Sequence, residues 1–586
     1  MNFFKTLEKD FVNIANSISP VDYSNLSEKI KKIKNTKKIN ICILSSYTTE
    51  ILKDFIVVQL AQRGIACNLN FLPYNYLEQE ILNDKSLIYS SKNDVILVLY
   101  LFNDFIDENS KKISKPNITR ISKSIKTIQK KSKAKIFISN FFQTQFLNYG
   151  DLYAEKEYSK ESLILESNIK LLSMVKKKIN VHILDLKNVI LRLGTNKSFN
   201  PKLNFFGKVP FSINAQIEVS KEIAKFIKAS YFTNKKCLVL DADNTLWGGI
   251  VGELGFENIM LSESYPGNTF KNFQNYLLNL HQRGIILALA SKNNFDDVKD
   301  ALSKNDDSIL KLNHFSSVKV NWDEKFINLQ KISHELNIGL DSMVFFDDSP
   351  FERELIKKKL PEVTVLDVPN DSSKYVNIIE NSELFDSLII SAEDKKRNKL
   401  YSQEKKRKKF KENFKDMNGF LSNLKMKVKF YNIDKGNLQR VVQLLSKTNQ
   451  FNLTTKRHSE SDLIKMFKNG SFGYSMRLSD CFGDNGIVGV IIISPFKNSW
   501  YVDTLLLSCR VIGRKVEDLM LSFIINKILE KNNSTKFNLL GEYIKTTKNQ
   551  LVADFYKSRG FKKEHKFWKK SFSTPVLPPN LFKITK

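Results

Sequence analysis

Apolar runs alternate with helical patterns along the first 225 residues of the chain. Residues 49–62 show a helical pattern, and the runs typical of buried strands cover residues 41–44, 68–72, 95–100, 135–139 and 181–186. Strands that alternate with helices in this way usually build a parallel sheet with helices on both faces. We therefore predict a doubly wound α/β domain over residues 1–225.

The same alternation returns later in the chain and divides the remainder. Residues 233–370 form a second predicted α/β domain, with apolar strands at 237–240, 285–290 and 343–346 and an amphipathic helix that carries Phe270, Phe273, Leu277 and Leu280. We expect a charged helical connector over 376–424, a third α/β domain over 425–570 and a tail over 571–586. The fold class is α/β throughout.

The composition is that of a soluble globular protein. Hydrophobic residues make up 42% of the 586 residues, and the longest apolar run, 95–102, is far shorter than the ~20 residues of a membrane-spanning helix. The five cysteines are scattered without the paired spacing of a metal site, so reduced thiols are expected. We predict a cytoplasmic protein with no membrane partner.

A net charge of +30 indicates an anionic partner. The lysines are spread along the whole sequence, with no ribonucleoprotein motif and no zinc-finger spacing, so we do not expect nucleic acid. The densest basic run, 395–409, is interpreted as a solvated linker helix. Acidic proteins and phosphorylated metabolites are both compatible partners.

Two aspartates follow the buried strand of the second domain in "CLVLDADNTLWGG". Asp241 emerges at the carboxyl end of the strand, where open α/β sheets bind their ligands, and Asp243 is placed to share that crevice. Adjacent carboxylates repel one another unless a cation or a proton lies between them, which suggests bound Mg²⁺. Aspartate is also a nucleophile towards phosphoryl groups. A turn with coincidental acids is the alternative for this motif alone.

Further polar residues follow the other strands of this domain in order. Ser291 ends the second strand, Lys325 lies in "NWDEKFINL", and Asp347 and Asp348 end the third strand in "FFDDSPFER". The ordered set resembles the haloacid dehalogenase (HAD) superfamily of phosphoryl-transfer enzymes over about 140 residues, with all four family motifs. Asp348 could instead be a solvated acid beside the ligand.

The HAD resemblance implies a role for each motif residue. Asp241 would be the nucleophile and Asp243 the general acid, with Ser291 and Lys325 holding the phosphoryl oxygens. Asp347 would bind Mg²⁺ with Asp241 and the backbone carbonyl of Asp243, supported by Asp348. Asn244 and Thr245, in the turn of the first motif, are expected at the substrate.

The spacing of the motifs leaves no room for a cap domain over this site. Residues 246–266 and the interval between Ser291 and Lys325 are both too short for one. An open site suits a substrate that is presented on, or delivered to, another protein. The glycines of the first interval predict a short mobile flap: Gly248, Gly249, Gly252 and Gly255.

The third domain carries a second candidate site in "SCRVIGRKVEDLML". Arg510, Gly513 and Lys515 stand at the start of a predicted helix, where exposed amides can bind phosphate. The stretch resembles the pyrophosphate loop of GNAT acyltransferases, with Lys515 in place of a small residue, and a simple basic helix start is the alternative. Cys509 lies beside this loop and is a candidate thioester nucleophile, although free cysteines are usually buried hydrophobes.

Several phrases in chain order resemble the FkbH-like family: "LDADNTLWGGIVGELG", "FFDDSPFERE", "SAEDKKRNKLY", "KTNQFNLTTKR", "FGDNGIVGV" and "LSCRVIGR". The resemblance implies transfer of a three-carbon unit from 1,3-bisphosphoglycerate to the phosphopantetheine of an acidic acyl carrier protein, with loss of phosphate. It also implies an SGNH-hydrolase-like first domain. That domain lacks the Gly-Asp-Ser turn, and His182 lies within a strand, so we expect a non-catalytic scaffold.

Two other functions are compatible with the sequence. A HAD-type phosphatase could act on a small phosphorylated metabolite without acyl transfer, using only the second domain. A non-catalytic basic protein could bind a carrier or nucleic acid through its charge alone. The third domain argues against the first alternative, and the complete acidic set argues against the second.

Overall fold

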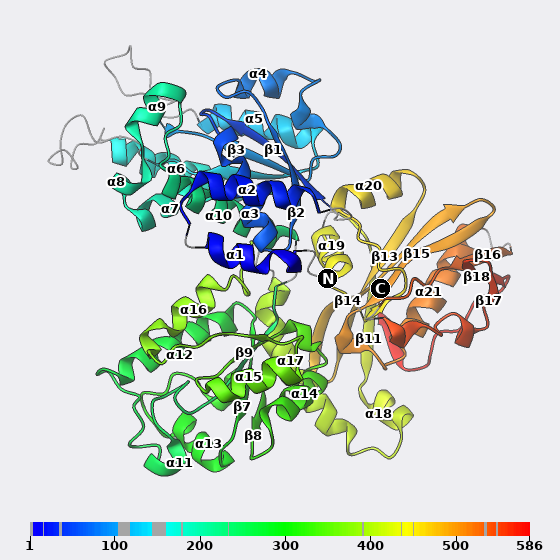
Figure 1. Cartoon of the computed structure of the whole chain (residues 1–586). Helices are drawn as coiled ribbons and strands as arrows, with labels where there is room; N and C mark the ends of the chain where they lie inside the picture. The colour runs from blue at the N-terminus through cyan, green and yellow to red at the C-terminus, as the bar shows by residue number, and fades with distance from the viewer. Residues whose placement is uncertain are drawn as a thin grey trace. The chain divides into compact units, whose positions relative to one another are not determined.

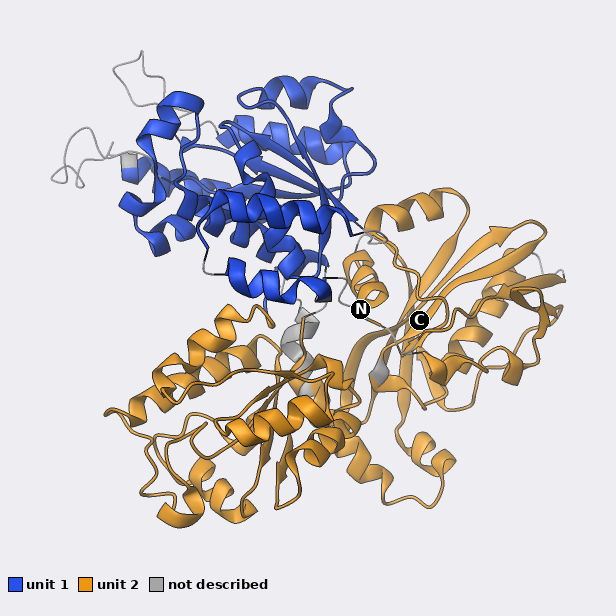
Figure 2. Ribbon diagram, viewed as in Figure 1, with its two compact units in different colours: residues 1–232, 386–388 blue, residues 233–385, 389–586 orange. Residues whose placement is uncertain are grey.

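A computed structural model describes residues 4–15, 17–33, 38–102, 118–142, 160–176, 178, 180–231, 234–388, 392–434, 436–448, 450–532, 536–546 and 549–585. The chain separates into two compact units (Figure 2). The first comprises Met1–Phe232 and Asp386–Leu388, and the second comprises Thr233–Phe385 and Ile389–Lys586. None of the described helices is long and apolar enough to cross a membrane.

The first unit is built on a parallel sheet with helices on both faces (Figure 1). The strand order is β2 (Ala66–Phe71), β1 (Lys38–Ser45), β3 (Val95–Leu99), β4 (Lys135–Ser139) and β5 (Val181–Leu184). Alternate residues of β1 face opposite sides, because successive side chains of a strand point in opposite directions. Ile41 and Ile43 pack with one set of helices, and Cys42 and Leu44 pack with the other.

The helices of the first unit are divided between these two faces of the sheet. On the face of Ile41 lie α3 (Lys53–Gln62), α7 (Leu186–Leu193) and α10 (Ile213–Tyr231). On the face of Cys42 lie α4 (Leu77–Leu82), α5 (Ile118–Lys131) and α6 (Lys160–Lys176). The remaining helices are α1 (Glu8–Ile14), α2 (Pro20–Lys31), α8 (Thr195–Ser198) and α9 (Pro201–Gly207). The predicted doubly wound α/β fold is confirmed.

Strand β5 of this unit ends two residues earlier than its apolar run predicts. We expected a strand over 181–186, but β5 ends at Leu184. Asp185 caps α7 instead, because its side chain accepts a hydrogen bond from the Asn188 amide at 3.1 Å. An acidic N-cap satisfies an amide that the helix leaves unpaired, so Leu186 becomes helical despite its apolar side chain.

The second unit contains two sheets, of which the first is again parallel. Its strand order is β10 (Thr364–Val365), β9 (Met343–Phe346), β6 (Cys237–Leu240), β7 (Ile286–Ser291) and β8 (Phe315–Val320). The central strand β6 is fully buried. Its two faces are covered by α12 (Gly267–Gln282), α13 (Phe295–Ser303) and α16 (Tyr375–Asn381), and by α14 (Lys325–Leu336) and α15 (Pro350–Lys359).

The other sheet of this unit is mixed. Its order is β17 (Lys562–Glu564), β18 (Phe567–Phe572), β16 (Phe537–Gly541), β15 (Ser499–Leu507), β14 (Gly483–Phe496), β13 (Phe472–Asp480), β11 (Met426–Asn432) and β19 (Phe582–Thr585), with β12 (Phe451–Asn452) against β15. Helix α21 (Val516–Lys531) packs on one face, and α19 (Leu438–Lys447) and α20 (Glu460–Lys468) pack on the other. The expected tail, 571–586, includes β19, which pairs in parallel with β11.

The basic connector helix is more buried than its charge predicts. Residues 395–409 lie in α17 (Ala392–Lys411), which we expected to be solvated. Tyr401 instead joins the core beside β6 and β9, and Arg407 is only 1% exposed. The solvated interpretation is therefore wrong for this face of α17, because an acidic side chain of the mixed sheet compensates the buried guanidinium. The short helix α18 (Met417–Asn423) follows.

Candidate active site

The acidic motif residues gather at the carboxyl edge of the parallel sheet in the second unit. Asp241 follows β6, and Asp347 and Asp348 follow the adjacent strand β9. Ser291 is the last residue of β7, on the other side of β6, and Lys325 begins α14. Parallel strands bring their carboxyl ends to one edge, which is why Asp241 can lie close to Lys325, 84 positions later, and to Asp347, 106 positions later.

Lys325 joins two of the carboxylates in the buried centre of this group. Its Nζ lies 3.0 Å from Asp241 Oδ2 and 2.7 Å from Asp347 Oδ2. Relative exposure is 4% for Lys325, 7% for Asp241 and 0% for Asp347. Water therefore screens these charges little, and each interaction is strong compared with a surface ion pair.

One ammonium does not neutralise three neighbouring carboxylates, and the pKa values reflect this. Burial and the charge of Asp241 raise the pKa of Asp347 to about 7, although Lys325 opposes the shift. The same two causes raise the pKa of Asp348 to about 6. Burial disfavours the Lys325 ammonium, but Asp241 and Asp347 outweigh it and raise the pKa of Lys325. The site is short of positive charge.

The arrangement fits a divalent cation. One carboxylate oxygen from each of Asp241, Asp347 and Asp348 lies within 4.8 Å of the others. Asp241 Oδ1 is buried and has no hydrogen-bond partner among the described residues. An oxygen donor buried without a partner is costly unless a ligand satisfies it, and Mg²⁺ prefers such hard oxygen donors. These three residues could hold the ion.

The turn after β9 is shaped by its own hydrogen bonds. Asp347 Oδ1 accepts from the Ser349 amide at 2.9 Å, and Arg353 donates to the backbone carbonyls of Asp347 and Asp348 at 2.8 and 2.7 Å. Pro350 begins α15 directly after the Ser349 cap. The position of both carboxylates is thus set by the first turn of the helix that follows them.

Asp243 lies apart from the three clustered carboxylates. Its Oδ1 accepts from Trp247 Nε1 at 2.9 Å and from the Val251 amide at 3.0 Å, and its Oδ2 accepts from Asn293 Nδ2 at 2.9 Å. Asn293 also donates to Ser291 Oγ at 3.1 Å. The side chain is therefore not placed as a cation ligand with the other three. It is held near Ser291, where a proton donor to a leaving group could act.

Sequence reasoning missed Asn293 and Trp247 as members of this site. Both lie beside motif residues, in "ASKNN" and "DNTLWGG", and their polar groups were the only available signal. Asn293 is 5% exposed and Trp247 is fully buried. Asparagine and indole N–H groups donate hydrogen bonds to a carboxylate without adding charge, so they fix the orientation of the Asp243 side chain without an ion pair.

Asn244 and Thr245, predicted at the substrate, have different surroundings. Asn244 has φ 50°, its side chain accepts from the Gly249 amide at 2.8 Å, and its backbone carbonyl accepts from the Tyr375 hydroxyl at 2.9 Å. This side chain therefore supports the loop. Thr245 is fully buried, and its Oγ1 has no partner among the described residues.

The loop after β6 is folded, which differs from the predicted mobile flap. Gly248 and Met260 exchange backbone hydrogen bonds of 3.1 and 2.9 Å, and α11 (Val251–Leu254) is a single turn whose Val251 is buried. These contacts tie the segment to the domain. The interval between Ser291 and Lys325 contains α13 and β8, so neither interval adds a cap domain. Three exposed aromatic residues follow strands of this sheet: Phe295 begins α13, Trp322 lies in the loop after β8, and Phe351 lies in the first turn of α15.

The loop of the third domain that was predicted to bind phosphate lies beside the mixed sheet. Arg510 and Gly513 belong to the loop between β15 and α21, in which Gly513 and Lys515 have φ values of 81° and 58°. Arg510 Nε donates to Ser508 Oγ at 3.3 Å. Cys509 begins a 3₁₀ turn, Cys509–Val511, but its side chain lies outside the described part of the structure.

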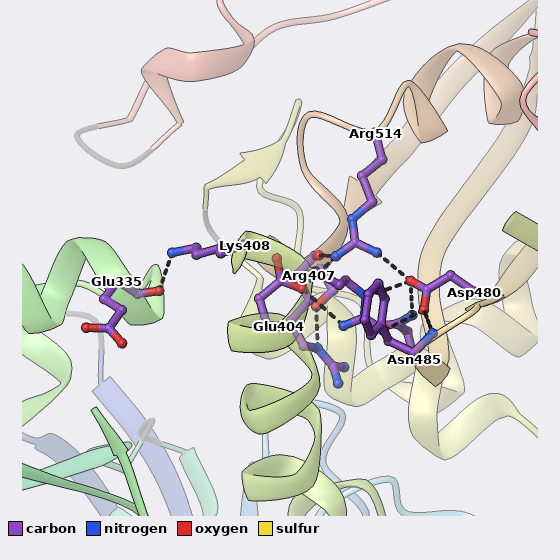
Figure 3. Close-up of polar contacts among 10 residues, drawn as sticks. Glu335, Glu404, Arg407, Lys408, Asp480, Asn485 and Arg514 are labelled. Carbon is purple, nitrogen blue, oxygen red and sulfur yellow. Dashed lines mark hydrogen bonds and ion pairs between the residues drawn. The ribbon is translucent and has the colours of Figure 1, made fainter. Parts of the chain in front are cut away.

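The neighbouring residue Arg514 faces inward and is not available to a phosphate. Its guanidinium contacts Asp480 Oδ2 at 3.1 Å and Glu404 Oε2 at 2.6 Å in the network of Figure 3. Glu517 and Asp518 in the first turn of α21 add negative charge at the helix start. Acidic side chains there compete with a phosphate for the same amides.

The first unit carries two serines at the end of β1, Ser45 and Ser46, in addition to His182. Ser45 Oγ donates to the Tyr47 carbonyl at 2.7 Å, and Ser46 Oγ accepts from the Leu101 amide at 3.0 Å. His182 lies in β5, where its ring is 5.6 Å from that of Phe137, and burial lowers its pKa to about 4. None of the described contacts joins these serines to His182.

Comparison with known proteins gives two informative matches. Residues 40–228 match the family model of the FkbH N-terminal domain. The structure is similar to the N-terminal part of BF1531 from Bacteroides fragilis, described as containing a phosphatase domain complexed with Mg, with 26% identity, a TM-score of 0.56 and coverage of 63% of this chain and 99% of that one. Together these matches support an FkbH-like family for the chain.

Other solved structures match more weakly. The ribosomal-protein-S18-alanine N-acetyltransferase of Escherichia coli has 11% identity and a TM-score of 0.20, covering 26% of this chain and 97% of its own. A putative platelet activating factor from Streptococcus pneumonia has 13% identity and a TM-score of 0.24, covering 38% and 97%. No curated protein matches the chain.

Proposed function

We propose that this chain is a HAD-type phosphatase in an FkbH-like role, loading a glyceryl unit from 1,3-bisphosphoglycerate onto the phosphopantetheine thiol of an acyl carrier protein. The observation that carries the phosphatase part is the buried group of Asp241, Asp347 and Lys325 at the carboxyl edge of a parallel sheet. The Mg-bound phosphatase domain of the Bacteroides fragilis protein supports the same chemistry.

Asp241 is the nucleophile in this proposal. Its carboxylate attacks the phosphorus of the phosphate monoester, and the bond between phosphorus and the substrate oxygen breaks with its electron pair on that oxygen. Asp243 gives a proton to the leaving oxygen, and water then hydrolyses the aspartyl phosphate to release phosphate. Bound Mg²⁺, held by Asp241, Asp347 and Asp348, would neutralise phosphoryl charge.

Transfer of the glyceryl group to the carrier thiol is proposed from the FkbH resemblance. The acyl phosphate of the substrate is an activated donor, and a thiol that attacks its carbonyl carbon displaces the second phosphate. The open edge of the site supports delivery to a protein, since Phe295, Trp322 and Phe351 are 47%, 71% and 71% exposed. Exposed aromatic side chains commonly anchor protein partners.

The test is a reaction with Mg²⁺, 1,3-bisphosphoglycerate and a panel of pantetheinylated carrier proteins. Phosphate release is measured, and intact mass spectrometry detects a glyceryl group on the carrier. Asp241→Asn should abolish release of the monoester phosphate, because an amide cannot form the acyl phosphate, whereas the phosphate displaced by the thiol is still released. The matched control is Asp296→Asn on the surface of α13, whose side chain is 87% exposed and which should behave as wild type.

Each result selects one function. Phosphate release together with a glyceryl carrier supports the full proposal. Phosphate release without any loaded carrier leaves a phosphatase that acts on a small metabolite. Absence of both, with a folded protein, indicates a non-catalytic carrier-binding or nucleic-acid-binding role. Wild-type turnover by Asp241→Asn would remove Asp241 from the mechanism.

A further inference from the structure

A second cluster of ionisable side chains lies on the mixed sheet, far along the chain from the acidic site. Its centre is Asp503 of β15, which is 6% exposed. Asp503 Oδ2 lies 2.6 Å from His458 Nε2, and Asp503 Oδ1 accepts from Lys456 Nζ at 2.7 Å. Thr504 Oγ1 also donates to Asp503 Oδ2 at 3.0 Å.

The segment before α20 brings His458 and Lys456 to this aspartate. It begins with β12, which pairs antiparallel with Leu506 and Leu507 of β15. Thr454 Oγ1 then donates to the Asp503 backbone carbonyl at 2.8 Å, and Ser459 caps α20. The phrase "QFNLTTKRHS", residues 450–459, thus runs beside β15 and ends where its basic residues face Asp503. No part of the phosphatase chemistry uses this phrase.

The pairing determines which nitrogen of His458 can take a proton. Burial alone would raise the pKa of Asp503, but His458 and Lys456 hold it below its ordinary value, so the carboxylate is ionised and only accepts. In the neutral imidazole, Nε2 therefore carries the hydrogen, and Nδ1 carries the lone pair. The His458 side chain keeps 17% of its surface exposed. A buried carboxylate that orients an accessible imidazole is the arrangement of a general base.

The ammonium of Lys456 is held beside this pair. Tyr501 OH accepts from Lys456 Nζ at 3.1 Å and donates to Glu542 Oε2 at 2.7 Å. The Lys456 side chain is 31% exposed, so it can also face a bound ligand. The imidazole therefore contacts one carboxylate, and the Lys456 ammonium links that carboxylate to the Tyr501 phenol and, through it, to Glu542. A positive charge next to the base can stabilise a thiolate or a developing oxyanion.

We propose that His458 and Asp503 form a general-base pair that activates the pantetheine thiol for acyl transfer. This inference rests on the proposed function and names a second catalytic centre for it. The thiol proton passes to His458 Nδ1, the sulfur bonds to the glyceryl carbonyl carbon, and the bond from that carbon to the phosphate oxygen breaks. Phosphate leaves with the electron pair, and the imidazolium returns its proton to water.

The match of proton affinities favours a thiol acceptor. A thiol has a pKa near ~8.5 and is a far stronger acid than an alcohol, so an imidazole can take its proton. An alcohol would resist deprotonation by imidazole far more strongly. The pair is therefore suited to the acceptor that the proposed reaction requires.

The experiment separates the two centres of the full-length protein by using two probes. Hydrolysis of p-nitrophenyl phosphate reports the Asp241 site. Thioester formation from 1,3-bisphosphoglycerate and free pantetheine, followed by mass spectrometry, reports acyl transfer. His458→Gln should keep the first activity within about twofold and lose about 100-fold or more of the second. Exposed His565, changed to Gln, is the matched control and should keep both activities.

A pH profile distinguishes catalysis from a structural role. In the wild type, thioester formation should rise with pH as the imidazole loses its proton and then level off. In His458→Gln this limb should disappear, and the remaining rate should follow the thiolate concentration towards pH ~8.5. Asp503→Asn should also slow transfer, because an amide cannot fix the imidazole tautomer in the same way.

The outcomes of the experiment are distinct. Wild-type protein that hydrolyses phosphate but forms no thioester overturns both the proposed transfer and this inference. A wild type that forms thioester, with His458→Gln equally fast and the pH limb unchanged, overturns only the general-base pair. If His458→Gln loses both activities through misfolding, Asp503→Asn decides: normal hydrolysis with slow transfer supports the pair, and unchanged transfer refutes it.

Discussion

At the scale of single residues, charge balance dominates the acidic site. Asp241, Asp347 and Asp348 lie together with Lys325 as their neighbouring cation, and burial with Asp241 raises the pKa of Asp347 to about 7. A carboxylate whose pKa is higher in the folded state destabilises the fold as pH rises through that range, because the unfolded chain releases its proton earlier. A bound cation should remove this penalty.

This balance predicts how Mg²⁺ affects stability. Its stabilising effect on the melting temperature should be small at pH 5, where Asp347 and Asp348 hold protons, and larger at pH 8, where both are ionised. Differential scanning calorimetry with Mg²⁺ or EDTA at both pH values measures it. Asp347→Asn should abolish most of the difference. An effect of equal size at both pH values would contradict cation binding by these carboxylates.

At the scale of elements, α17 joins the parallel and mixed sheets of the second unit. Tyr401 packs into the core beside β6 and β9, and Asn398 donates to the His281 carbonyl at 2.6 Å. Towards the other sheet, Arg407 contacts Asp480 of β13 through Nε and NH2 at 2.7 and 2.8 Å (Figure 3). A helix whose sequence is typical of a basic linker is therefore packed against both sheets.

Removal of Arg407 should destabilise the second unit. Asp480 has a fully buried side chain, and Arg407→Ala would leave its charge with the Arg514 ion pair of 3.1 Å and a hydrogen bond from the Phe482 amide at 2.9 Å. Breaking one partner of a buried ion pair typically costs about 3–5 kcal/mol. Urea denaturation measures the change in unfolding free energy.

The control for this variant is an ion pair on the surface of the same sheet. Arg477 contacts Asp484 with side chains that are 50% and 40% exposed. Arg477→Ala should change the unfolding free energy by no more than about 1 kcal/mol, because water screens such pairs. Equal effects of the two substitutions would show that the Arg407 network adds nothing beyond a surface contact.

At the scale of the whole molecule, the charge of +30 should govern encounter with an acidic carrier protein. Exposed charges are screened beyond ~8 Å at physiological ionic strength, so added salt should slow association much more than dissociation. Stopped-flow binding of a pantetheinylated acidic carrier between low and high salt measures both rates. A salt-independent association rate would favour an apolar docking surface, such as the exposed aromatic residues that follow strands of the parallel sheet.

The sequence by itself determined the elements and the order of the acidic motifs. Strands β6 and β9 have the predicted bounds, because short, fully buried parallel strands appear as uninterrupted apolar runs. The proximity of Asp241, Ser291 and Asp347 also followed from the chain, since adjacent parallel strands end at one edge. Local pattern and strand direction were sufficient for both.

Only the tertiary structure decided which polar groups pair over long distances. Asn293 contacts Asp243 across 50 residues, Arg407 contacts Asp480 across 73, and His458 contacts Asp503 across 45. Each pair depends on how two separate elements pack, and no local periodicity encodes that geometry. Charge patterning made α17 look solvated, because the carboxylate that compensates Arg407 lies on another sheet.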